Sequence, residues 1–313
     1  MNIVFLDRKS IGDDLDLSSF EKLGKVTMYD FTTPDEAPER VKDAEVIVIN
    51  KVPINEKTVG NAKDLKLVCV TATGTNNLDK EYLDRRSIAW RNVAGYSTET
   101  VTQHTFSLLF YLLEHMAYYD EYVKSERYAG DRLFTHFENR FHELSGMTWG
   151  IIGLGAIGRR VAEVAEAFGC KVQYFSTSGK NHTKDYKEVN FEELLSTSDI
   201  ISIHAPLDEN TEGLINTAAL QKMKKSAILL NLGRGPIIEE EDLAAAIDND
   251  VIAGAGLDVL STEPMSPDSP FLRIKNRDRL VITPHIAWAS IEARTRLMEI
   301  IYEQIEEFRK GRI

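Results

Sequence analysis

Residues 153–158 read Gly153-Leu154-Gly155-Ala156-Ile157-Gly158, a GxGxxG pattern. The apolar run 148–152 before it predicts a strand, and the segment 159–169 after it repeats apolar residues with helical spacing. In this context the first glycine permits a tight turn, the second lets the backbone approach a pyrophosphate, and the third allows helix and strand to pack closely. We interpret the stretch as a phosphate-binding turn; the alternative is a glycine-rich turn that binds nothing.

Runs rich in Val, Ile and Leu alternate with helical patterns on both sides of this turn, which favours doubly wound α/β domains with parallel sheets. The expected strands cover residues 3–6, 25–29, 45–49, 66–70, 88–92, 148–152, 171–175, 200–204, 227–231, 254–259 and 280–283. The last six are the number found in a complete dinucleotide-binding domain. One long helix is expected over 98–122, with Ser97 or Thr98 as its N-cap, and another over 290–308.

The segment 124–145 is rich in charged and aromatic residues and has no strong period. Two interpretations remain open. It is either an irregular arm that covers a second subunit or a surface loop packed on its own chain.

Composition limits the partners. The chain of 313 residues is 43% hydrophobic and has a formal net charge of −12, so it has room for two domains and is a poor match for nucleic acid or an anionic membrane. Cys69 and Cys170 have no CxxC spacing, and we expect reduced structural thiols. Without a leader-like segment or a membrane-length apolar run, a cytoplasmic protein is expected.

No metal site is expected. The histidines in question lack HExxH-type or carboxylate-paired ligand spacing; they are His104, His115, His136 and His142.

The strand after the glycine turn ends where an acidic residue usually binds the adenosine ribose of NAD. Here that position is Ser176, followed by Thr177 and, further on, Lys180. These side chains can accept a 2′-phosphate, so the sequence favours NADP slightly over NAD. The alternative is a solvated Lys180 and a Ser176 that binds an unmodified ribose.

Three polar residues follow later strands, at the edge where open α/β sheets bind ligands. Arg234 lies between two glycines and can bind a carboxylate in bidentate fashion or polarise a keto oxygen. His285 can deliver a proton near neutral pH, and Glu263 can fix its tautomer. Each has a simpler reading as a surface arginine, a structural histidine or a turn residue before proline. Reduction of a 2-keto acid needs three such functions: a group that binds the carboxylate, one that polarises the carbonyl, and one that delivers a proton.

The series GLGAIGR, NLGRG, GLDV followed by EP, and TPHIAWAS resembles the D-isomer-specific 2-hydroxyacid dehydrogenases over nearly the whole chain. The resemblance implies that Arg234 holds the substrate and polarises its carbonyl, that His285 is the acid/base, and that Glu263 pairs with it. It also implies a nicotinamide cofactor. Beside the glycines, the implied cofactor contacts are Ala156, Ile157, Ala205, Leu232 and Asp258.

The same resemblance implies that Thr73 and Gly74 lie in the loop that binds the substrate carboxylate. Lys51 is either a further substrate contact or a solvated lysine, and Trp288 either limits substrate size or packs between domains. The implied architecture is a flavodoxin-like substrate domain of residues 1–97 and 288–313, with a Rossmann cofactor domain of residues 98–287 inserted in it. The helix and arm after Thr98 resemble the family's dimer contact, so a homodimer is expected.

The implied reaction is NAD(P)-dependent reduction of a small 2-keto acid to the D-2-hydroxy acid. The motif around Trp288 favours hydroxypyruvate or glyoxylate; D-lactate or a branched-chain 2-hydroxy acid is the alternative. A nucleotide-sensing corepressor of the same fold is an alternative of another class, although this chain lacks long extensions. Glu263 argues against formate dehydrogenases, which have glutamine there.

Overall fold

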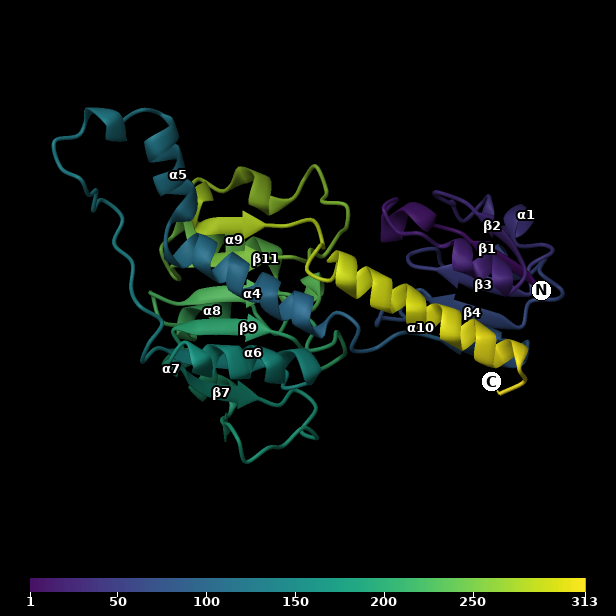
Figure 1. Ribbon diagram of the computed structural model, residues 1–313. Coiled ribbons are helices and arrows are strands. Elements are labelled where there is room, and N and C mark those ends of the chain that lie inside the picture. Colours follow the sequence, from purple (N-terminus) through teal and green to yellow (C-terminus); the bar gives the residue numbers. More distant parts are fainter. Residues whose placement is uncertain (313) are drawn as a thin grey trace. The chain divides into compact units, whose positions relative to one another are not determined.

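The computed structural model describes residues 1–312, which divide into two compact units (Figure 1). Unit 1 combines Met1–Ser97 with the chain from Trp288 onward, and unit 2 is Thr98–Ala287. Ile313, the last residue of the expected discontinuous domain, lies outside the described residues.

Within the described residues, unit 1 contains a five-stranded parallel sheet in the order β2-β1-β3-β4-β5. The strands are β1 (Asn2–Phe5), β2 (Lys25–Met28), β3 (Val46–Ile49), β4 (Leu67–Val70) and β5 (Ala89–Arg91). The helices are α1 (Ala37–Arg40), α2 (Glu56–Val59), α3 (Lys80–Arg85) and α10 (Ile291–Arg309). Every residue of β3 and β4 is buried, because apolar side chains pack on both faces of the sheet.

The last helix, α10, covers one face of this sheet although it lies almost 200 residues after β5. The side chain of Ser290 caps it by accepting a hydrogen bond from the N–H of Ala293 at 3.1 Å. Leu297, Ile301 and Ile305 then enter the same core as the strands. The C-terminal helix α10 and the N-terminal strands therefore share one hydrophobic core in unit 1.

Unit 2 contains, in the part of the chain that the structure describes, a seven-stranded parallel sheet in the order β12-β11-β10-β9-β6-β7-β8. Its strands are β6 (Thr148–Ile152), β7 (Lys171–Phe175), β8 (Lys187–Glu188), β9 (Ile200–Ile203), β10 (Ile228–Asn231), β11 (Gly254–Leu257) and β12 (Leu280–Ile282). The strand order reverses between β6 and β9, which are neighbours. Ligands bind at this switch point in open α/β sheets.

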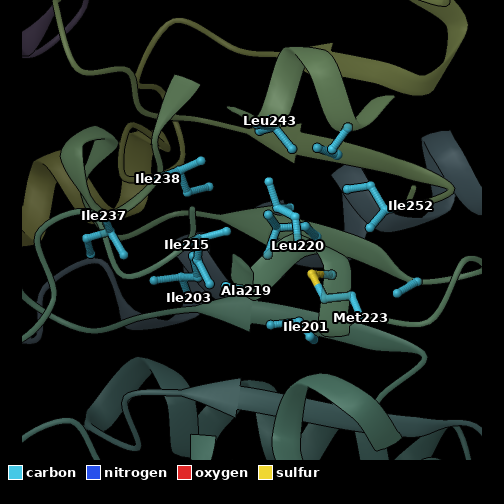
Figure 2. Packing of buried hydrophobic residues seen from close by; sticks show 14 of the residues in the cluster. Ile201, Ile203, Ile215, Ala219, Leu220, Met223, Ile237, Ile238, Leu243 and Ile252 are labelled. Atoms are coloured by element: carbon cyan, nitrogen blue, oxygen red, sulfur yellow. The ribbon is translucent and has the colours of Figure 1, made fainter. Parts of the chain in front are cut away.

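Helices cover both faces of the larger sheet (Figure 1). On one face lie α4 (Thr98–Leu113) and α6 (Ala156–Ala167), which pack against each other and on the strands. On the other face lie α7 (Phe191–Thr197), α8 (Thr217–Lys222) and α9 (Glu240–Asp248). Figure 2 shows the apolar layer beneath this second set, where Ile201 and Ile203 of β9 face Leu220 of α8 and Leu243 of α9.

Both sheets confirm the predicted doubly wound α/β fold class, and two details correct the sequence interpretation. β8 extends the larger sheet but was not expected, because its two exposed residues carry no apolar run. The single helix expected over 98–122 is divided into α4 and α5 (Met116–Lys124). The division falls at His115, whose φ of 52° is left-handed.

The chain between α5 and β6 contains a short 3-10 helix, Tyr128–Gly130, and is otherwise irregular. Figure 1 shows it standing out from the body of unit 2. It exposes large apolar side chains, namely Leu133, Phe134, Phe137 and Phe141. We call residues 125–142 the arm.

Both cysteines are buried free thiols. Burial raises the pKa of Cys69 to about 12 and that of Cys170 to about 11, so neither forms a thiolate near neutral pH.

Within residues 1–312, no three His, Cys, Asp or Glu side chains are grouped to hold a metal ion. No described helix has the length and apolar character needed to cross a membrane.

Candidate active site

The three glycines of the phosphate-binding turn have different surroundings. A Cβ on Gly153, whose φ is +92°, would lie 2.7 Å from Cα of Ala205, so the turn packs tightly on the chain after β9. A Cβ on Gly158 would lie 2.3 Å from the carbonyl oxygen of Gly153, because α6 starts against the strand. A Cβ on Gly155 would meet no atom of the described chain within 4 Å. The open position is the one that a pyrophosphate approaches.

α6 begins at Ala156, three residues earlier than predicted, so Ala156, Ile157 and Gly158 form its first turn. Its N-cap is Gly155, which has no side chain to satisfy the first N–H groups of the helix. Those groups and the helix dipole can hold a phosphate. The turn therefore fits a dinucleotide.

The predicted ribose position, Ser176, follows β7 and is buried. Its Oγ has no hydrogen-bond partner in the part of the chain that the structure describes. A buried hydroxyl without a partner is costly, and a ribose or phosphate oxygen of a dinucleotide would supply the missing hydrogen bond. Thr177 is partly exposed and Lys180 is exposed in the same loop.

The backbone after β10 forms a tight turn that is organised by Asn231, a residue the sequence analysis assigned no role. Its Oδ1 accepts a hydrogen bond from the N–H of Gly233 at 3.0 Å, and its Nδ2 donates to the carbonyl oxygen of Arg234 at 2.9 Å. A Cβ on Gly235 would lie 1.9 Å from the carbonyl carbon of Leu260. The arginine turn therefore lies against the loop that leads to Glu263. Leu232 is buried within it.

His285 and Glu263 form a pair, with 2.7 Å between Nδ1 of the imidazole and Oε2 of the carboxylate. The other carboxylate oxygen accepts a hydrogen bond from the N–H of Leu260 at 3.1 Å. A carboxylate can only accept, so Nδ1 carries the hydrogen. Nε2 is then the nitrogen that exchanges a proton with another molecule.

The sheet topology places the three candidate catalytic residues at the same edge of the larger sheet, the edge at the carboxyl ends of its strands. Arg234, Glu263 and His285 follow β10, β11 and β12, which are adjacent parallel strands. The glycine turn follows β6 at the same edge. One edge of unit 2 thus carries a phosphate cradle, a guanidinium and a carboxylate-bound imidazole.

Asp258, a predicted cofactor contact, is buried and binds the segment that carries His285. Its carboxylate accepts hydrogen bonds from the hydroxyl of Thr283 at 2.6 Å and from the N–H groups of Ile286 and Ala287, both at 2.9 Å. The same cluster includes His104 of α4, which the sequence analysis considered only as a metal ligand. A polar residue on the sheet-facing stripe of an amphipathic helix was the signal that could have identified it.

The remaining predicted site residues belong to unit 1. The hydroxyl of Thr73 donates to the carbonyl oxygen of Val93 at 3.0 Å, which fixes the loop that also contains Gly74. Trp288 packs against the unit 1 core, edge-on to Tyr96.

Lys51 is exposed in unit 1, and its backbone is held by a buried carboxylate that the sequence analysis did not identify. Asp7 accepts hydrogen bonds from the N–H groups of Asn50 at 2.9 Å and Lys51 at 2.7 Å. Burial raises the pKa of Asp7, and these N–H groups oppose that shift. The loop after β3 is therefore fixed at its first residues.

Comparisons with known proteins match this chain to one family. The family model described as D-isomer specific 2-hydroxyacid dehydrogenase, NAD binding domain, matches residues 106–287. A hydroxypyruvate reductase of Blautia hydrogenotrophica is 37% identical over 318 residues, covering 99% of this chain and 98% of that protein. A glycerate dehydrogenase of Methylorubrum extorquens is 36% identical over 311 residues, covering 99% and 96%.

Among solved structures, an acyclic imino acid reductase in complex with NADPH and D-Arg is similar to this chain with a TM-score of 0.88. The two are 29% identical, and the match covers 100% of this chain and 98% of that one.

Proposed function

This chain belongs to the D-isomer specific 2-hydroxyacid dehydrogenase family, and from that membership we propose that it reduces hydroxypyruvate or glyoxylate to the D-2-hydroxy acid. Membership makes it a nicotinamide-dependent oxidoreductase of 2-hydroxy acids. The choice of small substrate is supported by relatives named hydroxypyruvate reductase, glycerate dehydrogenase and glyoxylate reductase.

The observation that carries the proposed chemistry is the 2.7 Å contact between His285 and Glu263. It leaves Nε2 of His285 as the proton donor to the oxygen of the substrate carbonyl. Glu263 steadies the imidazolium before transfer and keeps the ring in one orientation. Arg234 binds the substrate carboxylate and draws electron density from the carbonyl. When bound, the nicotinamide supplies the hydride that reaches C2.

The residues of unit 1 are proposed to complete substrate binding. Thr73 and Gly74 would hold the carboxylate, with Lys51 as an added positive charge and Trp288 as a limit on substrate size. Ala205, Leu232 and Asp258 stay proposed as cofactor contacts. The proposed location is the cytoplasm, and the proposed assembly is a homodimer through the arm.

NADP is the proposed cofactor preference over NAD. The support is the absence of an acidic side chain at position 176, where the Oγ of the serine has no hydrogen-bond partner within residues 1–312, together with Lys180 in the same loop. An acidic residue here would repel a 2′-phosphate, whereas serine does not.

The test is a steady-state assay of NADPH and NADH oxidation with hydroxypyruvate, glyoxylate, pyruvate and a branched 2-keto acid, on wild type and His285→Gln. We expect hydroxypyruvate or glyoxylate to have the highest kcat/KM. His285→Gln should lower kcat by at least about 100-fold, the usual contribution of a general acid. Its dissociation constant for NADPH, measured by fluorescence titration, should change less than twofold.

Several outcomes would contradict the proposal. Pyruvate or the branched acid as best substrate would replace it with a D-lactate or branched-chain dehydrogenase. Tight nucleotide binding without turnover of any keto acid would favour a nucleotide-sensing protein. Equal losses of turnover and cofactor affinity in His285→Gln would exclude His285 as the proton donor. Lys275→Gln, at an exposed position away from this edge, is the control.

A further inference from the structure

The backbone at His285 has an unusual conformation. Its φ of 55° is left-handed, which costs a residue with a side chain about 1–2 kcal/mol. Within the turn, the N–H of His285 donates a backbone hydrogen bond to the carbonyl oxygen of Thr283 at 2.9 Å. Such a conformation persists when surrounding contacts fix the chain on both sides.

Asp258 supplies those contacts. One carboxylate oxygen binds Thr283, before the histidine, and Ile286, after it, while the other oxygen binds Ala287. The carboxyl group thus brackets His285 on both sides. It is 2% exposed, so water does not compete for its oxygens.

His104 approaches the same carboxylate from α4, 179 residues away in sequence from Thr283. Its Nε2 lies 2.9 Å from the hydroxyl oxygen of Thr283 and 3.5 Å from Oδ1 of Asp258. The ring is mostly enclosed, with 18% of the side chain exposed.

The hydrogen positions follow from what each group can donate. The hydroxyl of Thr283 has one hydrogen, and the 2.6 Å distance assigns it to Asp258. The hydroxyl oxygen can then only accept from the imidazole. Nε2 of His104 must therefore carry a hydrogen, which gives one directed chain from His104 through Thr283 to Asp258.

We propose that His104 is a positioning residue for the proton donor: its Nε2–H, relayed by the Thr283 hydroxyl, orients the Asp258 carboxylate and thereby fixes the left-handed turn that presents His285. This proposal rests on the proposed function only in taking His285 as the acid. A rigid turn lets the imidazole meet the substrate at one distance and angle, and an error of about 1 Å can cost about 100-fold in rate.

The variants separate the hydrogen bond from packing. His104→Leu and Thr283→Val remove the donor and the relay with little change in volume. His104→Gln retains an N–H donor at nearly the same reach, and Thr283→Ser retains the hydroxyl. Thr105→Val is the matched control, because the buried hydroxyl of Thr105 donates to the carbonyl oxygen of Val101 in the same helix, α4.

In steady-state assays, His104→Leu and Thr283→Val should each lower kcat by about 10- to 100-fold. The double variant should be no worse than either single one, because both break the same chain. His104→Gln and Thr283→Ser should recover most of the rate. Thr105→Val should retain the wild-type kcat and cofactor affinity.

Nitrogen-15 NMR of histidine-labelled full-length protein gives a readout that does not depend on turnover. We expect the His104 signals, assigned by their loss in His104→Gln, to show hydrogen on Nε2. The His285 signals should move in His104→Leu and return in His104→Gln.

The inference is overturned if His104 carries its hydrogen on Nδ1 alone, if His104→Leu keeps wild-type kcat, or if the two single effects multiply. Failure of the proposed function gives a different pattern. In that case wild type turns over no 2-keto acid, while the NMR signals still report whether His104 fixes the turn.

Discussion

At the scale of single residues, three histidines near the ligand edge of unit 2 have three different environments. His285 contacts a carboxylate and His104 a hydroxyl. His204, directly after β9, is partly exposed as a residue, yet both ring nitrogens are shielded from solvent and have no partner among residues 1–312. Burial lowers the pKa of His204 to about 3.

The low pKa of His204 makes folding sensitive to acid. In the unfolded chain this histidine takes up a proton below pH about 6.5, whereas the folded chain resists protonation down to about pH 3. The free energy of unfolding therefore falls as pH falls, because the unfolded chain gains a proton on His204 that the folded chain does not. Relative to His204→Leu, wild type should lose about 2 kcal/mol of unfolding free energy between pH 7 and pH 5.

Urea denaturation of both proteins at the two pH values measures this difference. The exposed His142→Gln should follow wild type. A pH-independent gap between wild type and His204→Leu would show that His204 is protonated in the folded protein.

Cofactor preference is also argued at one residue. Ser176→Asp places a carboxylate beside the expected 2′-position, where it repels a phosphate and can bind ribose hydroxyls. The ratio of kcat/KM with NADPH to that with NADH should fall by about 10- to 100-fold, corresponding to about 1.4–2.8 kcal/mol. Thr211→Ser, far along the chain from this loop, should leave the ratio unchanged. An unchanged ratio in Ser176→Asp would mean that this residue does not face the ribose.

Sequence could predict the residues whose chemistry is distinctive and whose neighbours form motifs. Arg234, Glu263 and His285 are of that kind. His104 is not, because its role depends on a contact with Thr283 that only the folded sheet creates. Asp7 was equally hidden, since its hydrogen bonds reach a loop more than 40 residues away.

At the scale of elements, the glycine turn and α6 allow a matched pair of substitutions. Gly158→Ala puts a Cβ 2.3 Å from a backbone oxygen, so we expect a loss of about 1–3 kcal/mol in unfolding free energy. A Cβ at Gly155 meets no atom of the described residues within 4 Å, and the backbone φ of −82° suits a residue with a side chain, so we expect Gly155→Val to leave the fold unaffected. The valine should nevertheless raise the dissociation constant of the cofactor at least about tenfold, because it occupies the place of the pyrophosphate.

Thermal unfolding and fluorescence titration distinguish these two effects. If Gly155→Val bound cofactor as wild type does, the nucleotide would have to bind elsewhere. If Gly158→Ala were as stable as wild type, helix and strand would have room that the structure does not show.

Strands with buried apolar runs were predictable almost to the residue, and β6 and β7 begin and end where the pattern does. β8 was not, since two exposed residues pair only because β7 offers a free edge. The break between α4 and α5 also has no local signal. The segment 98–122 contains neither glycine nor proline, and its apolar pattern continues across His115.

At the scale of the whole molecule, the arm is the feature that predicts self-association. Phe134 is 88% and Phe137 is 77% exposed, far more than aromatic side chains usually are. The double variant Phe134→Ser/Phe137→Ser should raise the dimer dissociation constant by at least about 100-fold, because each buried aromatic stabilises an interface by about 1.5–3 kcal/mol.

Sedimentation velocity over a concentration series provides the measurement. Phe31→Ser, which removes an aromatic side chain 69% exposed in unit 1, is the control and should leave the mass unchanged. A wild-type protein that sediments as a monomer would contradict self-association through the arm and favour the other interpretation, a surface loop packed on its own chain.

The distribution of chemistry between the units has a consequence for how such proteins can diversify. Arg234, Glu263, His285 and the glycine turn all lie within the uninterrupted stretch Thr98–Ala287. The redox groups can therefore be exchanged as one segment with two junctions. A chimaera that keeps Thr98–Ala287 of this chain and takes the flanking sequence from a relative should keep this chain's nicotinamide preference and show the relative's substrate preference.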